Sequence, residues 1–132
     1  MGTQDSKNAV EVASTIAAEI GALVTLVNVI NLPQVEYILY QQQRLNPVKD
    51  IAYQMVDQQA EIGRLLGAQV NIRVLTGTHP DREILKFAKD EGIDLIIIGS
   101  HIRMVTGRVF FGHAVDTLLS KANCPVAVVT LS

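Results

Sequence analysis

Two short apolar runs constrain the fold of this chain most strongly. Residues 23–30 are almost entirely apolar, and residues 94–98 are apolar after their first member. Such runs are typical of strands that are buried on both faces of a sheet. Residues 69–75 instead alternate between polar and apolar, which predicts a half-exposed strand at a sheet edge. Residues 126–131 form a further apolar run and predict the last strand.

Helical patterns separate these strands. Gly21 stands where a helix ends in a left-handed residue, and Gly67 and Gly92 end the next two helices. Pro47 and Pro80 suit a first helical turn. Strands that alternate with helices predict a doubly wound α/β fold, a parallel sheet with helices on both faces. Ligands bind such sheets at the carboxyl ends of the strands. Apolar residues recur at helical spacing in residues 9–20, 48–65, 84–88 and 115–122.

Residues 99–112 connect the 94–98 strand to a helix that we expect to begin near Gly112. The backbone N–H groups and positive dipole end of such a helix suit a phosphate. By itself, the pattern fits an ordinary strand–loop–helix connection better than a phosphate site.

This stretch resembles the universal stress protein domain. Members that bind ATP carry Gly, two residues, Gly, nine residues, then Gly followed by Ser or Thr, and finally a Cys-Pro-Val strand. Gly99 and Gly112 match the first and third glycines, and residues 124–126 match Cys-Pro-Val. Ile102 replaces the second glycine, and His113 replaces the Ser or Thr.

The resemblance implies an adenine nucleotide alpha hydrolase-like sheet with strand order 3-2-1-4-5. Its members open with an apolar strand that ends in Asp-Gly-Ser. Here Met1 replaces the aspartate, and Gly2 and Thr3 match the next two residues. The missing first strand would lie centrally, between the 23–30 and 94–98 strands, where each unmade hydrogen bond costs about 1–3 kcal/mol. We therefore expect one domain, residues 1–132, truncated at its N-terminus; a partner chain that fills the gap is the alternative.

The resemblance also implies an adenine-nucleotide site. Backbone N–H groups around Gly99, Gly112 and His113 would hold phosphates, and Val29 and Thr3 would line the base and ribose. Because Ile102, His113 and the absent aspartate depart from the pattern, we expect ATP or another adenine nucleotide to bind weakly or not at all. Arg103 and Arg108 lie in the same loop and could also contact phosphates. For these two arginines and for His113, the alternative is a solvated position on the surface. The candidate nucleotide-binding residues are Gly2, Thr3, Val29, Gly99, Ser100, Arg103, Gly112, His113 and Ala114.

Three functions remain open. The first is a non-enzymatic, nucleotide-responsive regulatory or stress-response module. The second is a nucleotide-free dimerisation or regulatory domain cut from a cation/proton antiporter, because residues 110–112 (Phe-Phe-Gly) and the Gly-Thr opening resemble the stress-protein domains appended to those transporters. The third, an ATP-hydrolysing enzyme, ranks last because no evident base or nucleophile lies near the loop.

Composition and spacing exclude several other classes. A formal charge of −2 gives no electrostatic case for nucleic acid, and no apolar run is long enough to span a membrane. The three histidines and the single cysteine lack metal-ligand spacing, and one cysteine agrees with a reducing, cytoplasmic location. We read residues 31–46 as a surface excursion. The uncovered edge of the 126–131 strand predicts a homodimer through those residues.

Overall fold

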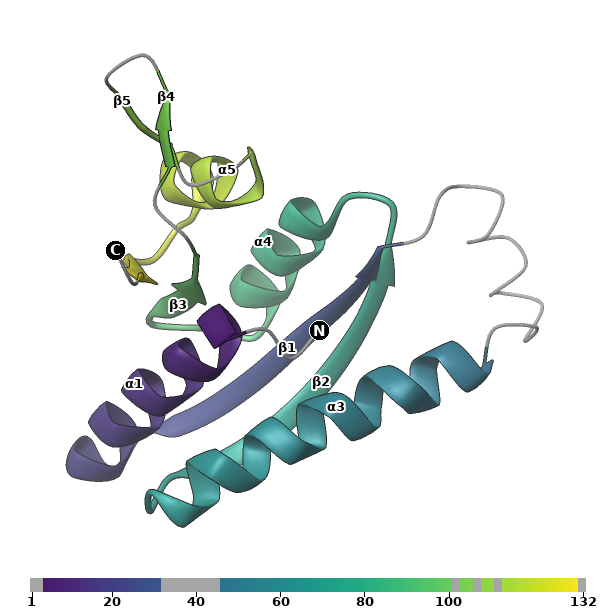
Figure 1. The fold of residues 1–132 in the computed structure, drawn as a ribbon, viewed down its shortest axis with the longest axis vertical. Helices are drawn as coiled ribbons and strands as arrows, with labels where there is room; N and C mark the ends of the chain where they lie inside the picture. Colours follow the sequence, from purple (N-terminus) through teal and green to yellow (C-terminus); the bar gives the residue numbers. More distant parts are fainter. Residues whose placement is uncertain (1–3, 32–45, 101–102, 106–107, 111–112, 131–132) are drawn as a thin grey trace.

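A computed structural model of the chain describes residues 4–31, 46–100, 103–105, 108–110 and 113–130. Helices and strands alternate along it, as the sequence predicts (Figure 1). The region 31–46, interpreted as a surface excursion, lies almost entirely outside the described residues. The elements are α1 (Gln4–Ile20), β1 (Leu23–Asn31), α3 (Asn46–Leu65), β2 (Gln69–Gly77), α4 (Pro80–Asp90), β3 (Ile96–Gly99), β4 (Arg103–Val105), β5 (Arg108–Phe110), α5 (His113–Lys121) and β6 (Val126–Val129).

The helix ends follow local sequence signals. Gly21, Gly67 and Gly92 have φ angles of 70°, 96° and 63°, so each adopts the left-handed conformation. The sequence predicted this conformation for Gly21 and a helix end at the other two glycines. Pro80 lies in the first turn of α4, where its missing N–H costs no helical hydrogen bond. These residues fix where one element stops and the next begins.

The strands form two separate parallel pairs and one hairpin. β1 pairs with β2 in a register that runs from Leu23↔Gln69 to Asn31↔Gly77. β3 pairs with β6 from Ile96↔Val126 to Gly99↔Val129. β4 and β5 form an antiparallel hairpin. Among the described residues no strand joins β1 to β3, so the position expected for a first, central strand separates the two pairs.

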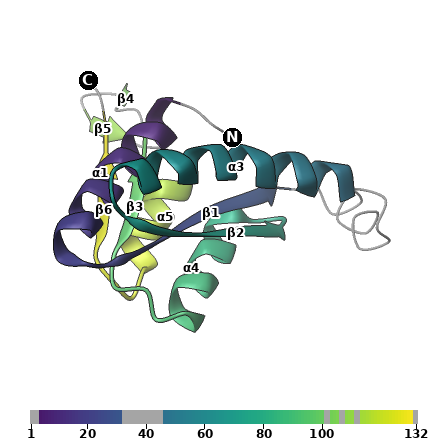
Figure 2. The same cartoon turned by 90° about the horizontal axis from the view of Figure 1, so that it is seen from below.

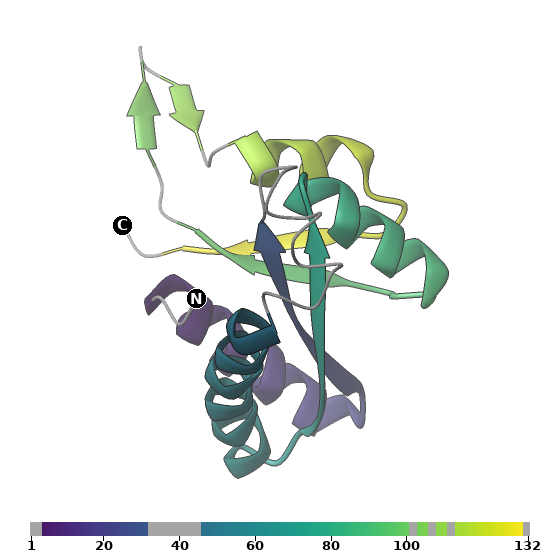
Figure 3. The ribbon, with the colours of Figure 1, turned by 90° about the vertical axis from the view of Figure 1, so that its right-hand side faces the viewer.

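The helices cover the strands from both sides. α1 and α3 pack against each other and against the strands on one side, and α4 and α5 pack against each other on the other side (Figure 2). The β3–β6 pair is rotated relative to the β1–β2 pair (Figure 3). A rotation between strands is the expected result of sheet twist, which is about 20–25° for each neighbouring strand. The arrangement confirms the doubly wound α/β architecture.

The best-buried apolar cluster lies between α1, α3 and the β1–β2 pair. Close approach of the two helices depends on Gly63, because a Cβ added there would lie 2.7 Å from Ser14 Oγ and 2.9 Å from a Val70 methyl group. Ser14 is completely buried at this crossing. The members of the cluster are Ala17, Val24, Ala60, Ala68 and Val70.

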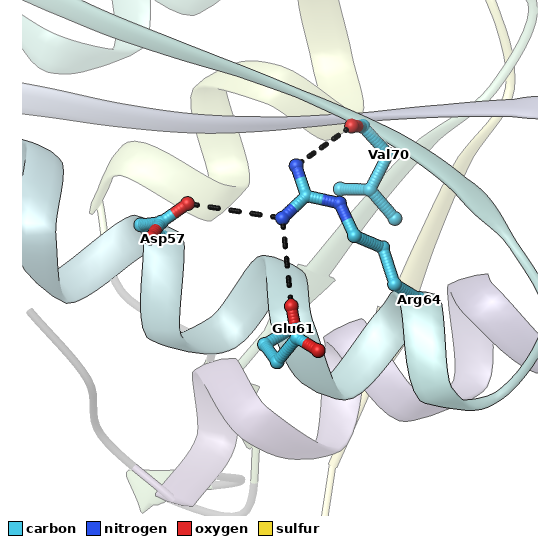
Figure 4. Close-up of polar contacts among 4 residues, drawn as sticks. All are labelled: Asp57, Glu61, Arg64 and Val70. Carbon is cyan, nitrogen blue, oxygen red and sulfur yellow. Dashed lines mark hydrogen bonds and ion pairs between the residues drawn. The ribbon is translucent and has the colours of Figure 1, made fainter.

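Arg64, near the end of α3, forms a hydrogen bond to the backbone of β2 (Figure 4). Its guanidinium donates a hydrogen bond of 3.3 Å to the Val70 carbonyl and lies 3.8 Å from Asp57 and 3.7 Å from Glu61. All three charged side chains are more than two-fifths exposed, so the two ion pairs contribute little stability. The contact to the backbone carbonyl is the part of the cluster that positions β2.

Two expectations for the apolar strands require correction. The 23–30 strand was expected inside the sheet, but β1 has a strand partner on one side only within the described part of the chain. Burial on both faces was expected for both runs, yet Leu23 is 56% exposed and every residue of β3 is half-buried. For β3 the physical reason is the missing neighbour, since its residues line a cavity at an open strand edge. Leu23 is the first residue of β1 and does not line that cavity.

The predicted strand bounds are close to those of the structure. β3 begins two residues later than the predicted 94–98 strand and includes Gly99. β6 accounts for the first four residues of the predicted 126–131 strand, whose last residue lies outside the described part. β2 shows the alternating burial predicted in its first half and pairs on one side only, as an edge strand does.

Candidate functional site

The candidate site lies at the carboxyl end of β3. Figure 1 shows β3 running toward the β4–β5 hairpin, with α5 following the hairpin in the chain. α5 begins at His113, as predicted for a helix starting near Gly112. A loop between a parallel strand and the amino end of the next helix is where an α/β sheet places its ligand site.

Two of the predicted nucleotide-binding residues line the same cavity. Val29 of β1 and Gly99 of β3 both line a cavity of about 400 Å³ between the two strand pairs, which we call the β1–β3 cavity. Its walls are mainly apolar side chains of α1, β1, α4 and β3. A mostly apolar cavity that runs along parallel strands can accept the flat face of a base or an apolar side chain.

Ser100 is held by the β3–β6 pair. Its N–H donates a 3.0 Å hydrogen bond to the carbonyl of Val129, and the residue is buried. This N–H is therefore already used and is not a free donor for a phosphate.

The remaining predicted residues are described only in part. The structure gives the backbone of Arg103 in β4 and of His113 and Ala114 at the start of α5. Gly2, Thr3 and Gly112 lie outside the described residues. The roles of all six residues in nucleotide binding stay predictions.

The first turn of α1 packs directly on Gly99. A Cβ added at Gly99 would overlap the carbonyl group of Asp5 and would lie 3.1 Å from the backbone nitrogen of Ser6. Gly99 is therefore required for close backbone approach between α1 and the end of β3. This contact puts a carbonyl oxygen, a hydrogen-bond acceptor, at the point where the sequence predicts phosphate contacts.

Sequence reasoning missed both this contact and the β4–β5 hairpin. The hairpin pairs Arg103 with Phe110, Met104 with Val109 and Val105 with Arg108. Two three-residue segments rich in β-formers flank Thr-Gly, a spacing typical of a two-residue hairpin connection, so a signal was present. The contact of α1 with Gly99 has no such signal, because it joins residues about a hundred positions apart.

No group of three or more potential metal ligands exists among the residues that the structure describes. At the amino end of α4, Thr78 and His79 lie on the surface and share a hydrogen bond of 3.0 Å.

Within the described elements, no helix is both long and apolar enough to cross a membrane.

The fold is that of a doubly wound α/β domain, and the candidate site lies at the carboxyl end of β3. The sequence model of the universal stress protein family matches residues 1–130. The chain belongs to the universal stress protein family.

Relatives with known sequences match half of the chain. Universal stress protein MJ0577 of Methanocaldococcus jannaschii is 38% identical over 64 residues, which are 48% of this chain and 39% of that protein. Universal stress protein MJ0531 of the same organism is 32% identical over 63 residues, 48% of this chain and 36% of that protein. Each match therefore spans less than half of the relative's own length.

Solved structures share the fold across nearly the whole chain. The structure of MJ0577 superposes with a TM-score of 0.78 at 22% identity, covering 99% of this chain and 91% of that chain. A universal stress protein in complex with cAMP gives 0.72 at 20% identity, covering 99% and 91%. The Archaeoglobus fulgidus protein in complex with dAMP gives 0.65 at 22% identity, covering 96% and 88%. These similarities confirm the universal stress protein, or adenine nucleotide alpha hydrolase-like, fold.

Proposed function

We propose that this chain is a non-enzymatic regulatory domain of the universal stress protein family that binds adenine nucleotides weakly. Two proteins with this fold are described in complex with cAMP and dAMP, which share an adenine base, a sugar and a phosphate. The corresponding class of ligand for this chain is therefore an adenine nucleotide.

The contact between α1 and Gly99 carries the proposal of weak binding. The Asp5 carbonyl lies against Gly99, so its oxygen and a phosphate oxygen would be two acceptors at one place, with no proton to share. A nucleotide would have to displace the first turn of α1 before its phosphates approached the end of β3. That displacement subtracts from the binding free energy.

The sequence of the loop supports the same conclusion. Ile102 stands in place of a glycine that lets backbone approach a phosphate, and its β-branched side chain adds bulk. His113 stands in place of a compact hydroxyl donor. Losing a hydrogen bond to a charged group costs about 1.5–3 kcal/mol, and two such losses convert a micromolar site to roughly a millimolar one.

Calorimetric titration tests this proposal. We expect no ATP binding tighter than about 100 μM, and we expect the double variant Ile102→Gly/His113→Ser to bind at least about tenfold more tightly. His79→Ser is the matched control because it makes the same His-to-Ser change at an exposed position outside the 99–112 segment, at the amino end of α4. A tight ATP complex of the unmodified chain, or release of inorganic phosphate from ATP, would overturn the proposal.

We also propose a homodimer through β6. The Ile96 and Ser100 N–H groups donate to the carbonyls of Pro125 and Val129, and directions alternate along a strand, so the backbone groups of Val128 point away from β3. Among the described strands β6 has only β3 as a neighbour. An open apolar edge of this kind tends to pair with another chain.

Sedimentation at high micromolar concentration should therefore show a dimer. Val128→Pro removes one outward N–H and leaves the β3 ladder intact, so we expect it to weaken the dimer at least about tenfold. Val128→Thr keeps the N–H and the β-branched shape and is the control. A monomer at that concentration, or a dimer whose affinity is unchanged by Val128→Pro, would contradict this interface.

Attachment to a cation/proton antiporter stays a prediction from the sequence.

A further inference from the structure

One exposed side of α3 carries a row of large apolar side chains. Ile51, Met55, Ile62 and Leu65 follow one another along this helix, with Gln58 in the middle, at alternating spacings of four and three residues. Residues at these spacings lie along one side of a helix, and the same heptad spacing forms the contact between paired helices. Ile51 is 59% exposed and Leu65 is 80% exposed, whereas Met55 and Ile62 are half-buried. We call these five residues the α3 seam.

The α3 seam is not the side of the helix that builds the core. Val56, Ala60 and Gly63 are buried and form the inner side of α3. A Cβ added at Gly63 would meet Ser14 of α1 and Val70 of β2, so this inner side faces the rest of the domain. Successive residues of a helix are about 100° apart, which turns the α3 seam away from the core contact. Its exposed apolar surface is therefore free for a partner.

The helical layer that carries the α3 seam is acidic. α1 and α3 form this layer (Figure 2), and together they contain six Asp or Glu residues and three Lys or Arg residues. On α3, the Asp57 and Glu61 side chains are 60% and 63% exposed and share one cation, Arg64. On α1, Glu11 and Glu19 are exposed. The helices of the other layer, α4 and α5, contain four Asp or Glu residues and four Lys or Arg residues, so the excess of negative charge belongs to the α1–α3 layer.

We infer that the α3 seam is a docking site for a basic amphipathic helix of another protein. The apolar side of such a helix would cover the seam, and its lysines or arginines would face the carboxylates of α1 and α3. From Ile51 to Leu65 the seam is about 21 Å long at 1.5 Å per residue, which matches about four turns of a partner helix. The inference depends neither on nucleotide binding nor on the β6 dimer.

Charge favours another protein over a second copy of this chain as the partner. Two α3 seams packed face to face would bring the acidic layers of both copies together, and like charges that face each other across an interface oppose association. Arg64 cannot relieve this repulsion, because Asp57 and Glu61 of its own chain already share its guanidinium. A basic helix meets the same carboxylates with the opposite charge.

Binding of a designed peptide to the whole chain tests the inference. The probe is a helical peptide of about 15 residues with leucine at the spacing of the α3 seam, lysine and alanine elsewhere, and one tryptophan at its end. Because the chain contains no tryptophan, the fluorescence of that residue reports on the peptide alone. We expect saturable binding that weakens as salt is added. Two control peptides should bind at least about tenfold more weakly: one with glutamate in place of every lysine, and one of unchanged composition with its leucines spread around the helix.

Two double variants of the protein then locate the binding. Ile51→Gln/Leu65→Gln removes exposed apolar surface from the α3 seam without changing the charge, and it should weaken the peptide at least about tenfold. The matched control, Ile16→Gln/Ile20→Gln, changes two residues of α1 that are 44% and 71% exposed, and it should leave binding unchanged. Ile16 lies two positions after Ser14, which is at the crossing with α3, and therefore on the far side of α1.

Absence of saturable binding, equal binding of the glutamate peptide, or unchanged binding to Ile51→Gln/Leu65→Gln would overturn the inference. Sedimentation of the same variant without peptide gives a further test. A dimer that dissociates when Ile51 and Leu65 are replaced would also overturn it, because the α3 seam would then be an interface between two copies of this chain.

Discussion

Replacing Leu118 with alanine is expected to lower the free energy of unfolding by about 2–5 kcal/mol. Leu118 lies in α5 and is only 1% exposed, which makes it the largest fully buried side chain in the described residues. Truncation removes apolar surface from the core and leaves a cavity that the surrounding structure fills only partly. For a domain with a total stability of about 5–15 kcal/mol, this is a large fraction.

Leu119→Ala is the matched control for this experiment. Leu119 is the next residue of the same helix and is 45% exposed, so its truncation changes helix propensity and composition in the same way but removes little buried surface. We expect urea unfolding to show a loss below about 1 kcal/mol for this control. Equal losses for the two variants would mean that α5 does not pack through Leu118.

Features encoded by local sequence were predictable. The helix ends at Gly21, Gly67 and Gly92 follow from a left-handed conformation that glycine adopts without strain. Alternation in residues 69–75 predicted an edge strand, and β2 has a neighbour on one side only within the described sheet. The doubly wound architecture followed from the alternation of strands and helices, and the family resemblance supplied the strand order that left a central position between β1 and β3.

Features that depend on distant residues were not predictable. An apolar run indicates burial on both faces only if neighbours exist on both sides, and β3 lacks one, so its residues are half-buried. The contact of Asp5 with Gly99 and the crossing of Ser14 with Gly63 join residues far apart in the sequence, where no periodicity can indicate them. Of the candidate site, only the placement of Val29, Gly99 and Ser100 rests on described side chains or contacts; the nucleotide itself remains a proposal.

Among the described residues, the sheet has an open strand position between β1 and β3. Amide hydrogen exchange tests this arrangement directly. Ile96 and Ile97 are adjacent and identical in side chain, so they form an internal comparison. The Ile96 N–H donates to the Pro125 carbonyl at 3.0 Å, whereas the Ile97 N–H points toward the cavity. Exchange rates of paired and unpaired amides differ by the free energy needed to open the paired one.

We predict that, in the isolated chain, the Ile97 amide exchanges at least about a hundredfold faster than the Ile96 amide, a difference of about 2.8 kcal/mol. The measurement is residue-resolved exchange by NMR on the unliganded protein. Equal, strong protection of both amides would contradict the open strand position, because it would mean that another strand already pairs with the inner edge of β3.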